Sequence, residues 1–329
     1  MQKVFVTGAS GFIAKHILRE LLDRGYAVRA SVRSETKKSE IEALFPQASI
    51  EFAFLDLNSD DGWAEAMAGC DVLIHTASPF PLISPADPDI LIKPAVDGTL
   101  RAMNAAKAAG IQRVVLTSSS AAIFKDASKP LDAPSDESNW TTADDASVSA
   151  YEASKTLAEK AAWDFVTANP EIELTTINPG MVLGPSMDAN YGSSLELVEQ
   201  LISGKIPMAP PTQMPSVDVR DVAMMHVAAL SNDATKGERI AAAADCPQFF
   251  EIAKMLKDQD ASYKTPSVEA PGWLVRVLGL FMPDAKSVVP NLDRNLTVIG
   301  TKAERLFGFT YIPVKDALAA SAQSVQKYS

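Results

Sequence analysis

Short apolar runs alternate with longer amphipathic segments through the first half of the chain. The short runs are rich in Val, Ile and Phe, as strands are, and the segments between them carry apolar residues at helical spacing. The expected strands are 4–6, 27–32, 50–55, 72–74, 114–116 and 174–177, and the expected helices are 13–24, 40–45, 62–68, 90–109 and 151–169. Alternation of this kind requires parallel strands joined by right-handed crossovers. The pattern predicts an α/β fold with a doubly wound, Rossmann-type parallel sheet.

The pattern becomes irregular after Pro179, where prolines are frequent and isolated helices alternate with loops. One apolar run, 216–219, is expected to return to the sheet and to be followed by a helix over 220–230. We therefore expect two interleaved units. The doubly wound domain takes residues 1–178 plus about 216–243, and a smaller, irregular α/β lobe takes about 179–215 plus 244–329.

Composition and charge narrow the class of protein. The net charge of −11 disfavours nucleic acid and anionic membranes as partners, since both would call for a basic face. The apolar run 273–282 is too short to span a bilayer and contains Arg276, so we expect a core-facing or pocket-wall helix. Two cysteines and a start without a signal-peptide pattern favour a cytoplasmic protein with reduced thiols.

A glycine-rich turn follows the first strand. Gly8, Gly11 and Ala14 have the spacing G-x-x-G-x-x-A, between a strand and a helix. Gly8 permits the tight turn, Gly11 lets backbone N–H groups approach a pyrophosphate, and Ala14 allows close packing of helix and strand. This context favours a dinucleotide site over a purely structural turn.

The end of the second strand discriminates between NAD and NADP. An NAD enzyme usually has an acidic residue there, whereas this strand ends in Arg33, with Lys37 and Lys38 nearby. A guanidinium can pair with a 2′-phosphate through two hydrogen bonds. Glu35 dilutes this basic cluster, but the pattern still favours NADP, with NADPH preferred over NADH.

Other strand ends supply further candidates. Asp56 and Leu57 close the third strand, where they are candidates to meet the adenine, although the Asp56 carboxylate could equally cap the following helix. Thr76, Ala77 and Ser78 close the fourth strand, where small residues would let a cofactor approach. His75 is interpreted as a structural residue. The histidines have no metal-ligand spacing to one another or to carboxylates, so no metal site is expected.

A phenol and an ammonium share one face of the helix expected at 151–169. Tyr151 and Lys155 are four residues apart, and a serine run (118–120) ends the fifth strand at the same edge of the sheet. A phenol held near a fixed cation can give a proton to a carbonyl oxygen, because the cation favours the phenolate and lowers the phenol's pKa.

These motifs together resemble the extended short-chain dehydrogenase/reductases, in particular the dihydroflavonol reductase, cinnamoyl-CoA reductase and aldehyde/ketone reductase branch. The matching stretches are 7–13, 28–33, 116–119 and 151–163. The resemblance implies a catalytic triad of Ser119, Tyr151 and Lys155, with Ser120 as the alternative serine. The predicted NADP contacts are Gly8, Ser10, Gly11, Phe12, Ile13, Arg33, Lys37, Asp56, Leu57, Thr76, Ala77, Ser78, Tyr151, Lys155, Pro179 and Val182.

The substrate side departs from the plant enzymes in this branch. Where dihydroflavonol reductases have an Asn that contacts substrate hydroxyls, this chain has the apolar stretch 121–124. The stretch 95–99 also lacks the Asn that supports a proton-relay water in many short-chain reductases. We expect an apolar pocket for an aliphatic or aromatic carbonyl compound, with its wall formed by Pro79, Phe80, Phe124, Met181 and Tyr191.

The predicted function is NADPH-dependent reduction of a small-molecule aldehyde or ketone by a monomer or homodimer. A nucleotide-sugar epimerase or dehydratase is the alternative enzyme, because it shares the fold, the Tyr/Lys pair and a similar phosphate turn. The arginines after residue 179 are widely scattered, which disfavours the diphosphate site that such an enzyme needs. An NADP-sensing regulator would usually lack the Tyr/Lys pair.

Overall fold

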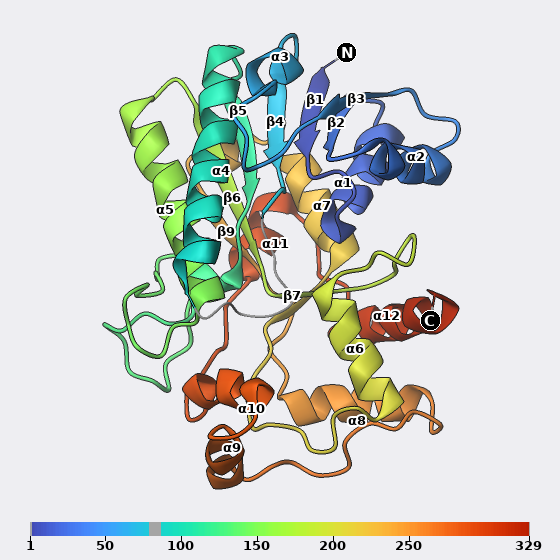
Figure 1. Ribbon diagram of the computed structural model, residues 1–329, viewed down its shortest axis with the longest axis vertical. Helices are drawn as coiled ribbons and strands as arrows, with labels where there is room; N and C mark the ends of the chain where they lie inside the picture. The colour runs from blue at the N-terminus through green and yellow to red at the C-terminus, as the bar shows by residue number, and fades with distance from the viewer. Residues whose placement is uncertain (1, 79–86, 329) are drawn as a thin grey trace.

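A parallel sheet with helices on both faces forms the upper part of the molecule in the computed structural model, which describes residues 2–78 and 87–328 (Figure 1). Among these residues the sheet has seven strands, in the order β3-β2-β1-β4-β5-β6-β9, and every neighbouring pair is parallel. The strands are β1 (Lys3–Thr7), β2 (Ala27–Val32), β3 (Ile50–Phe54), β4 (Val72–His75), β5 (Arg113–Thr117), β6 (Glu173–Pro179) and β9 (Arg239–Ala242). The predicted doubly wound α/β fold is confirmed.

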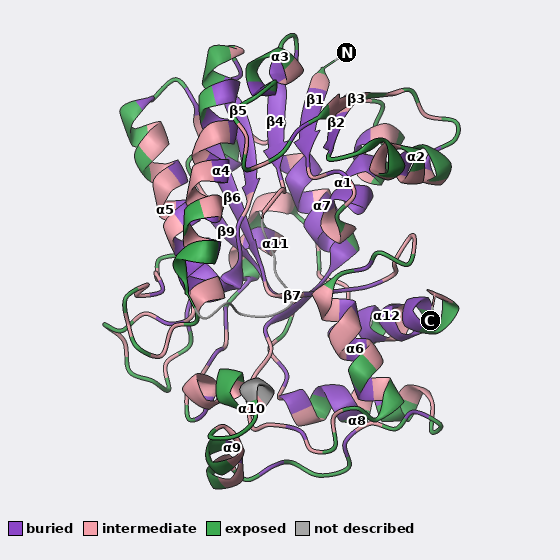
Figure 2. Ribbon diagram, viewed as in Figure 1, coloured by how far each residue is buried: buried purple, intermediate pink, exposed green. Residues whose placement is uncertain are grey.

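Alternation along the strands builds a separate core on each face of the sheet. Val4 and Val6 pack toward α1 (Phe12–Asp23), α2 (Glu35–Leu44) and α7 (Val219–Ala229). Phe5 and Leu73 pack on the opposite face, toward α3 (Trp63–Met67), α4 (Asp89–Ala108) and α5 (Ala150–Ala168). Apart from the edge strand β3, the strands are buried along most of their length (Figure 2). Because the strand order reverses between β1 and β4, a crevice is expected at their carboxyl ends.

Helix α2 begins five residues before the predicted start at Glu40. Ser34 caps it, because its side chain accepts a hydrogen bond from the Lys37 backbone N–H. The early start places Lys37 in the first turn of the helix, next to the end of β2.

The smaller lobe lies below the carboxyl ends of the strands (Figure 1). Its two-stranded sheet pairs β7 (Met181–Leu183) with β8 (Ser216–Asp218), and α6 (Ser193–Ser203), α8 (Phe249–Gln259) and α12 (Val314–Tyr328) share one apolar cluster. The remaining helices are α9 (Gly272–Leu278), α10 (Pro283–Val288) and α11 (Thr301–Phe307), with 3₁₀ turns η1 (Ser120–Ala122), η2 (Asp233–Thr235) and η3 (Val289–Asn291).

The prediction that 216–219 returns to the main sheet is wrong. That segment forms β8, which pairs with β7, and the edge of β6 is occupied by β9 instead. Helix α11 also packs on β9 and α7, although its residues lie in the stretch predicted for the smaller lobe. The division of the chain into 1–178 plus 216–243 and 179–215 plus 244–329 therefore stays a prediction.

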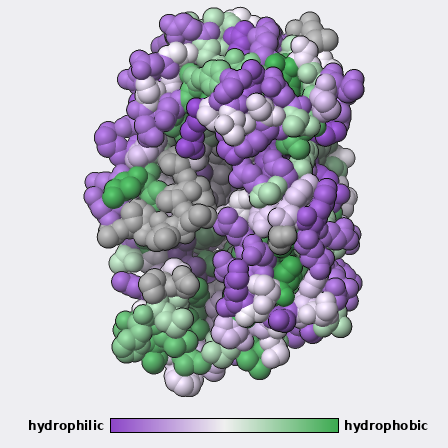
Figure 3. Space-filling model, turned by 45° about the vertical axis from the view of Figure 1, so that its right-hand side comes forward, coloured by the Kyte–Doolittle hydropathy of each residue, from purple (hydrophilic) through white to green (hydrophobic). Residues whose placement is uncertain are grey.

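Most of the apolar run 273–282, which includes α9, does not face the core, and its role as a pocket wall stays a prediction. Val275 is buried, but Trp273, Leu280 and Phe281 are 66%, 77% and 80% exposed. The helix is only seven residues long, and Val275 is its one buried residue. The exposed residues form the hydrophobic area at the lower end of the molecule in Figure 3. No helix in the described part of the chain has the length and hydropathy of a membrane span.

Candidate active site

The glycine-rich turn brings the ends of β1 and β4 into close contact. Gly8 has a φ of +65°, and a Cβ atom there would lie 2.9 Å from the Cα of Ala77. Only glycine accepts both the left-handed backbone and the contact. The Gly11 N–H donates to the Gly8 carbonyl at 2.9 Å, which closes the turn at the start of α1. This geometry presents backbone rather than side chains to the space above the turn, as a pyrophosphate site requires.

A cavity of about 630 Å³ opens above this turn, at the carboxyl ends of the strands. The predicted cofactor residues that line it are Gly8, Ser10, Gly11, Arg33, Lys37, Leu57, Thr76, Ala77 and Ser78. The sequence interpretation missed Ser31, Val32, Ser34, Leu55, Trp63, Asn190, Gly192, Ser193 and Glu196. The last four belong to the smaller lobe, and no local motif marks them as part of a cofactor site.

The basic residues at the end of β2 differ in how they are neutralised. The Lys37 ammonium is 2.7 Å from the Glu40 carboxylate, and the Lys38 ammonium is 2.7 Å from Glu35. Arg33 lines the cavity and forms no ion pair with any residue in the described ranges. Glu35, which diluted the basic cluster in the sequence, is thus engaged by Lys38, and the Arg33 guanidinium is the cation left facing the cavity.

The smaller lobe is attached directly to the glycine-rich turn. Lys15, on α1 and 2% exposed, donates to the Asp188 carboxylate at 2.5 Å and to the Asn190 carbonyl at 2.9 Å. The Asn190 side chain donates to the Ser10 carbonyl at 3.0 Å. These bonds hold the segment before α6 across the cavity from the turn, so that both lobes form its walls.

Several predicted contacts are not at this cavity. Phe12 and Ile13 begin α1 and pack, partly buried, against the core, while Pro179 and Val182 are buried in β6 and β7. The Asp56 carboxylate is exposed and accepts from the backbone N–H of Asn58, so it stabilises its own turn.

The predicted substrate wall is also dispersed. Pro79 and Phe80 lie outside the described residues. Phe124 packs against the cluster around Ile123, Met181 packs in the core of the smaller lobe, and Tyr191 is 8% exposed beside α12. The assignment of Phe124, Met181 and Tyr191 to a substrate pocket stays a prediction.

The start of α5 is fixed by a reciprocal cap. The Ser149 hydroxyl accepts from the Glu152 N–H at 3.2 Å, and the Glu152 carboxylate accepts from the Ser149 N–H at 2.6 Å. The Lys125 ammonium, 2% exposed on its side chain, lies 2.9 Å from the same carboxylate. Because these contacts surround the first turn of α5, they hold Tyr151 in a fixed position.

Ser119, Tyr151 and Lys155 lie together at the carboxyl end of β5. The hydroxyls of Ser119 and Tyr151 are hydrogen-bonded to each other, and the Lys155 ammonium is 5.9 Å from the centroid of the Tyr151 ring. The Ser118 hydroxyl points the other way and donates to Glu159 at 2.6 Å. Ser120 begins η1 with its side chain buried, and the hydrogen bond to Tyr151 favours Ser119 over it.

The pKa shift of Tyr151 is opposite to the one expected from the sequence. We expected Lys155 to lower the pKa of Tyr151, but burial raises the pKa of the phenol above 10.0, and the Ser119 hydrogen bond opposes that shift. Burial also lowers the pKa of Lys155 to about 8. Tyr151 is thus protonated at neutral pH, as a proton donor must be.

Glu159, one turn after Lys155, is a buried carboxylate that joins three strands to α5. It accepts from Arg239 at 2.6 Å, from Asn178 at 2.6 Å, and from the Ser118 hydroxyl. The Asn178 amide also donates to the Ser119 carbonyl at 3.2 Å. The network holds the backbone of Ser119 against α5, and sequence spacing alone did not predict it.

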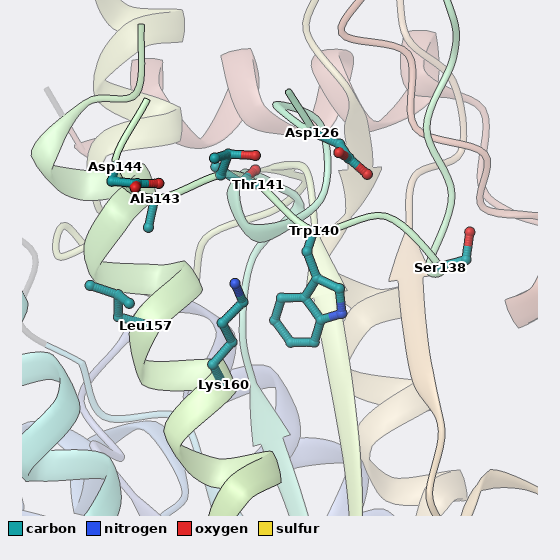
Figure 4. A pocket seen from close by; sticks show the side chains of 9 residues that line it. Asp126, Ser138, Trp140, Thr141, Ala143, Asp144, Leu157 and Lys160 are labelled. Carbon is teal, nitrogen blue, oxygen red and sulfur yellow. The ribbon is translucent and has the colours of Figure 1, made fainter. Parts of the chain in front are cut away.

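A second, shallower cleft of about 520 Å³ lies beside α5 (Figure 4). Trp140 and Lys160 line it, and the Arg239 guanidinium stacks 3.5 Å from the centroid of the Trp140 ring. None of the predicted site residues lines this cleft. The described residues also contain no group of His, Cys, Asp and Glu side chains that could hold a metal ion.

Comparison with known proteins agrees with this arrangement. Residues 4–243 match the model of the NAD dependent epimerase/dehydratase family. The chain is 32% identical over 338 residues to cinnamoyl-CoA reductase CAD2 of Medicago truncatula, covering 98% of this chain and 95% of that protein. It is 31% identical over 352 residues to the NADPH-dependent methylglyoxal reductase GRE2 of Saccharomyces cerevisiae, covering 99% and 98%. The crystal structure of yeast Gre2 with NADPH superposes with a TM-score of 0.83 at 30% identity, over 99% of this chain and 98% of that one.

Proposed function

The chain belongs to the NAD dependent epimerase/dehydratase family, and we propose that it is an NADPH-dependent reductase that converts an aldehyde or ketone to an alcohol. The hydrogen-bonded pair of Ser119 and Tyr151, with Lys155 one turn further along α5, is the observation that carries the proposal. Relatives named as reductases of carbonyl compounds, among them the yeast methylglyoxal reductase, support it.

The cavity fits NADP. The glycine-rich turn leads into α1, whose first backbone N–H groups have no partner within the helix and can bind a pyrophosphate. The Arg33 side chain lines the same cavity at the end of β2. We propose that Gly8, Ser10, Gly11 and Arg33 hold the cofactor, with Thr76, Ala77 and Ser78 beside it. When bound, NADPH supplies a hydride to the carbonyl carbon.

Ser119, Tyr151 and Lys155 would orient the substrate carbonyl and supply its proton. The Ser119 hydroxyl donates to the substrate oxygen and orients the carbonyl, while the Tyr151 phenol gives its proton to that oxygen as negative charge develops. The Lys155 ammonium stabilises the phenolate that remains. Ser119 is buried and Tyr151 and Lys155 are half-buried, and this partial exclusion of water strengthens each of these interactions.

The pH dependence of the reaction follows from Lys155. Reduction needs the Lys155 ammonium, and burial lowers the pKa of Lys155 to about 8. We therefore expect kcat/KM to reach its maximum at pH values well below 8. It should then fall about tenfold per pH unit above it, as the lysine loses its proton. A pH series of NADPH oxidation checks this, and a flat profile through the same range would contradict the role given to Lys155.

Arg33→Ala should weaken NADPH binding and spare NADH. The variant loses charge-assisted hydrogen bonds to the 2′-phosphate, worth about 1.5–3 kcal/mol, or roughly 10- to 150-fold in Kd. Fluorescence titration with both cofactors measures this. Arg24→Ala is the matched control, because Arg24 pairs with Glu20 on the surface of α1 and does not line the cavity. An equal loss for NADPH and NADH would refute the 2′-phosphate contact.

The alternative is a nucleotide-sugar epimerase or dehydratase, which would need cations in the smaller lobe for a diphosphate. Three of the five arginines after residue 179 are already engaged: Arg220 with Asp218, Arg239 with Glu159, and Arg276 with Asp293. This pairing favours the reductase. A regulator without catalysis has no use for a hydrogen-bonded Ser119–Tyr151 pair.

An activity screen tests the proposal. The purified protein is incubated with NADPH, and NADH in parallel, and with methylglyoxal, aliphatic and aromatic aldehydes, diketones and ketoesters. Loss of absorbance of the reduced cofactor with one carbonyl class supports the reductase, and turnover of a nucleotide sugar without net NADPH oxidation would support the epimerase. We further propose a cytoplasmic monomer or homodimer, which gel filtration and cell fractionation would test.

A further inference from the structure

His75 ends β4 on the face of the sheet that α4 and α5 cover. Its side chain projects on the same side as that of Leu73, two residues earlier, which belongs to the apolar core on that face. The ring is 1% exposed, and its Nδ1 is 2.8 Å from the hydroxyl oxygen of Thr7 on the neighbouring strand. His75 therefore lies on the face of the sheet covered by α4 and α5, and it pairs in register with Leu116 of β5, the strand that leads to Ser119.

The bonds of Thr7 define which ring nitrogen of His75 carries the proton. The Thr7 hydroxyl oxygen accepts from the backbone N–H groups of Thr76 at 3.0 Å and Ala77 at 3.1 Å, which occupies both of its lone pairs. Its hydroxyl proton is then donated to His75 Nδ1. Burial and the Lys155 charge lower the pKa of His75 to about 3, so the ring is neutral at neutral pH. In a neutral ring with Nδ1 as acceptor, the proton is on Nε2.

The Nε2–H group is buried and has no acceptor within the described ranges. Burying a donor without a partner is costly, and such groups usually meet a bound water or a ligand atom. Lys155 is the charged group whose field acts on His75, and its ammonium is a donor too. One oxygen that accepted from both donors would satisfy the buried Nε2–H group and would stabilise the ammonium.

We propose that His75 is a positioning residue for Lys155: its Nε2–H and the Lys155 ammonium donate to one shared acceptor oxygen, a bound water or a cofactor hydroxyl. The oxygen holds the ammonium beneath the Tyr151 ring and favours its charged form. The effect on turnover rests on the proposed reductase function. The hydrogen bonds to the shared oxygen do not, because they would form in the unliganded protein or in its NADP complex.

Variants of His75 separate this role from simple packing. His75→Leu fills the space and removes the donor, so kcat should fall about tenfold, the equivalent of one lost hydrogen bond. The alkaline limb of the pH profile should also move about half a unit to one unit lower, because Lys155 loses the acceptor that favours its ammonium. His75→Gln keeps an N–H donor and should restore both to near the wild-type values.

His226→Leu is the matched control. His226 is also fully buried and neutral, but both of its ring nitrogens have partners, Val222 and Thr117. Its replacement should lower stability without moving the alkaline limb. A His75→Leu variant whose alkaline limb coincides with that of the wild type would overturn the proposal.

Nuclear magnetic resonance gives a readout that does not need turnover. The chain has three histidines, so the ring signals of His75 are those present in the two-bond ¹H–¹⁵N spectrum of the wild type and missing from that of His75→Gln. The Nε2–H tautomer is expected, with a Lys155 side-chain titration that shifts to lower pH in His75→Leu. An Nδ1–H tautomer, or a Lys155 titration unchanged by the variant, would overturn the proposal even if no carbonyl substrate were found.

Addition of NADP⁺ identifies the shared oxygen. If the Nε2–H resonance shows exchange contact with water and is unchanged by NADP⁺, the acceptor is a bound water. If the resonance moves to a hydrogen-bonded position only on NADP⁺ addition, the acceptor is a cofactor hydroxyl. Either result supports the shared acceptor, and a resonance that indicates no hydrogen bond in both states would refute it.

Discussion

Tyr151→Phe is expected to lower kcat for carbonyl reduction by about 10²- to 10⁴-fold while leaving NADPH affinity nearly unchanged. The substitution removes only the phenol oxygen, which is the group that would give the proton to the substrate. Burial keeps the pKa of Tyr151 above 10.0, so the wild-type phenol carries that proton throughout the neutral range. Steady-state rates of NADPH oxidation, combined with fluorescence titration of NADPH, separate the two effects.

Tyr263→Phe provides the control for Tyr151→Phe. Tyr263 is 7% exposed in the smaller lobe, and its hydroxyl is hydrogen-bonded to the side chain of Gln326 at 3.1 Å. Loss of this hydroxyl should cost some stability and leave kcat within about twofold of the wild type. Full activity of Tyr151→Phe would rule out the phenol as general acid and direct attention to a water or to Ser119.

Glu159→Ala should lower the free energy of unfolding by about 3–5 kcal/mol. The substitution leaves the Arg239 guanidinium, 9% exposed, without its carboxylate. It also leaves the Ser118 hydroxyl without its acceptor and removes one of the two acceptors of the Asn178 amide. A buried charge that loses its partner is far more costly than a lost surface pair. Urea unfolding followed by circular dichroism measures the difference.

Two further variants test the cause of this loss. Glu171→Ala removes the carboxylate of a surface pair, 3.9 Å from Lys107, and should cost less than about 1 kcal/mol. Combining Glu159→Met with Arg239→Met removes both buried charges and should recover part of the stability that Glu159→Ala loses. If the double variant were less stable than Glu159→Ala, the unpaired guanidinium would not be the source of the cost.

The sequence predicted the parts of the structure that depend on neighbours along the chain. The strands of the first half, the glycine turn at Gly8 and the helical spacing of Tyr151 and Lys155 are local patterns, and the structure has each of them. Each follows from steric rules or from a fixed period, so no knowledge of the tertiary fold is needed.

Contacts between distant segments could not be predicted in the same way. Glu159 meets Arg239, which is 80 residues away, because β9 joins the sheet beside β6. Asn190 reaches the Ser10 carbonyl across 180 residues for a similar reason. Helix α9 was expected to face the core from its apolar composition, but composition does not specify which neighbour covers a face, and Trp273 is exposed.

The passage of the chain between its two lobes has a consequence for how the protein can be altered. After β7 and β8 in the smaller lobe, the chain returns to the sheet in α7 and β9, leaves it for α8, and returns again in α11 before ending in α12. No single cut among the described residues therefore separates the sheet and its helices from the smaller lobe. To exchange substrate preference with a relative, several discontinuous segments would have to be transplanted together. We therefore expect the substrate range of such proteins to change by point substitutions where the two lobes meet, and not by recombination of whole segments.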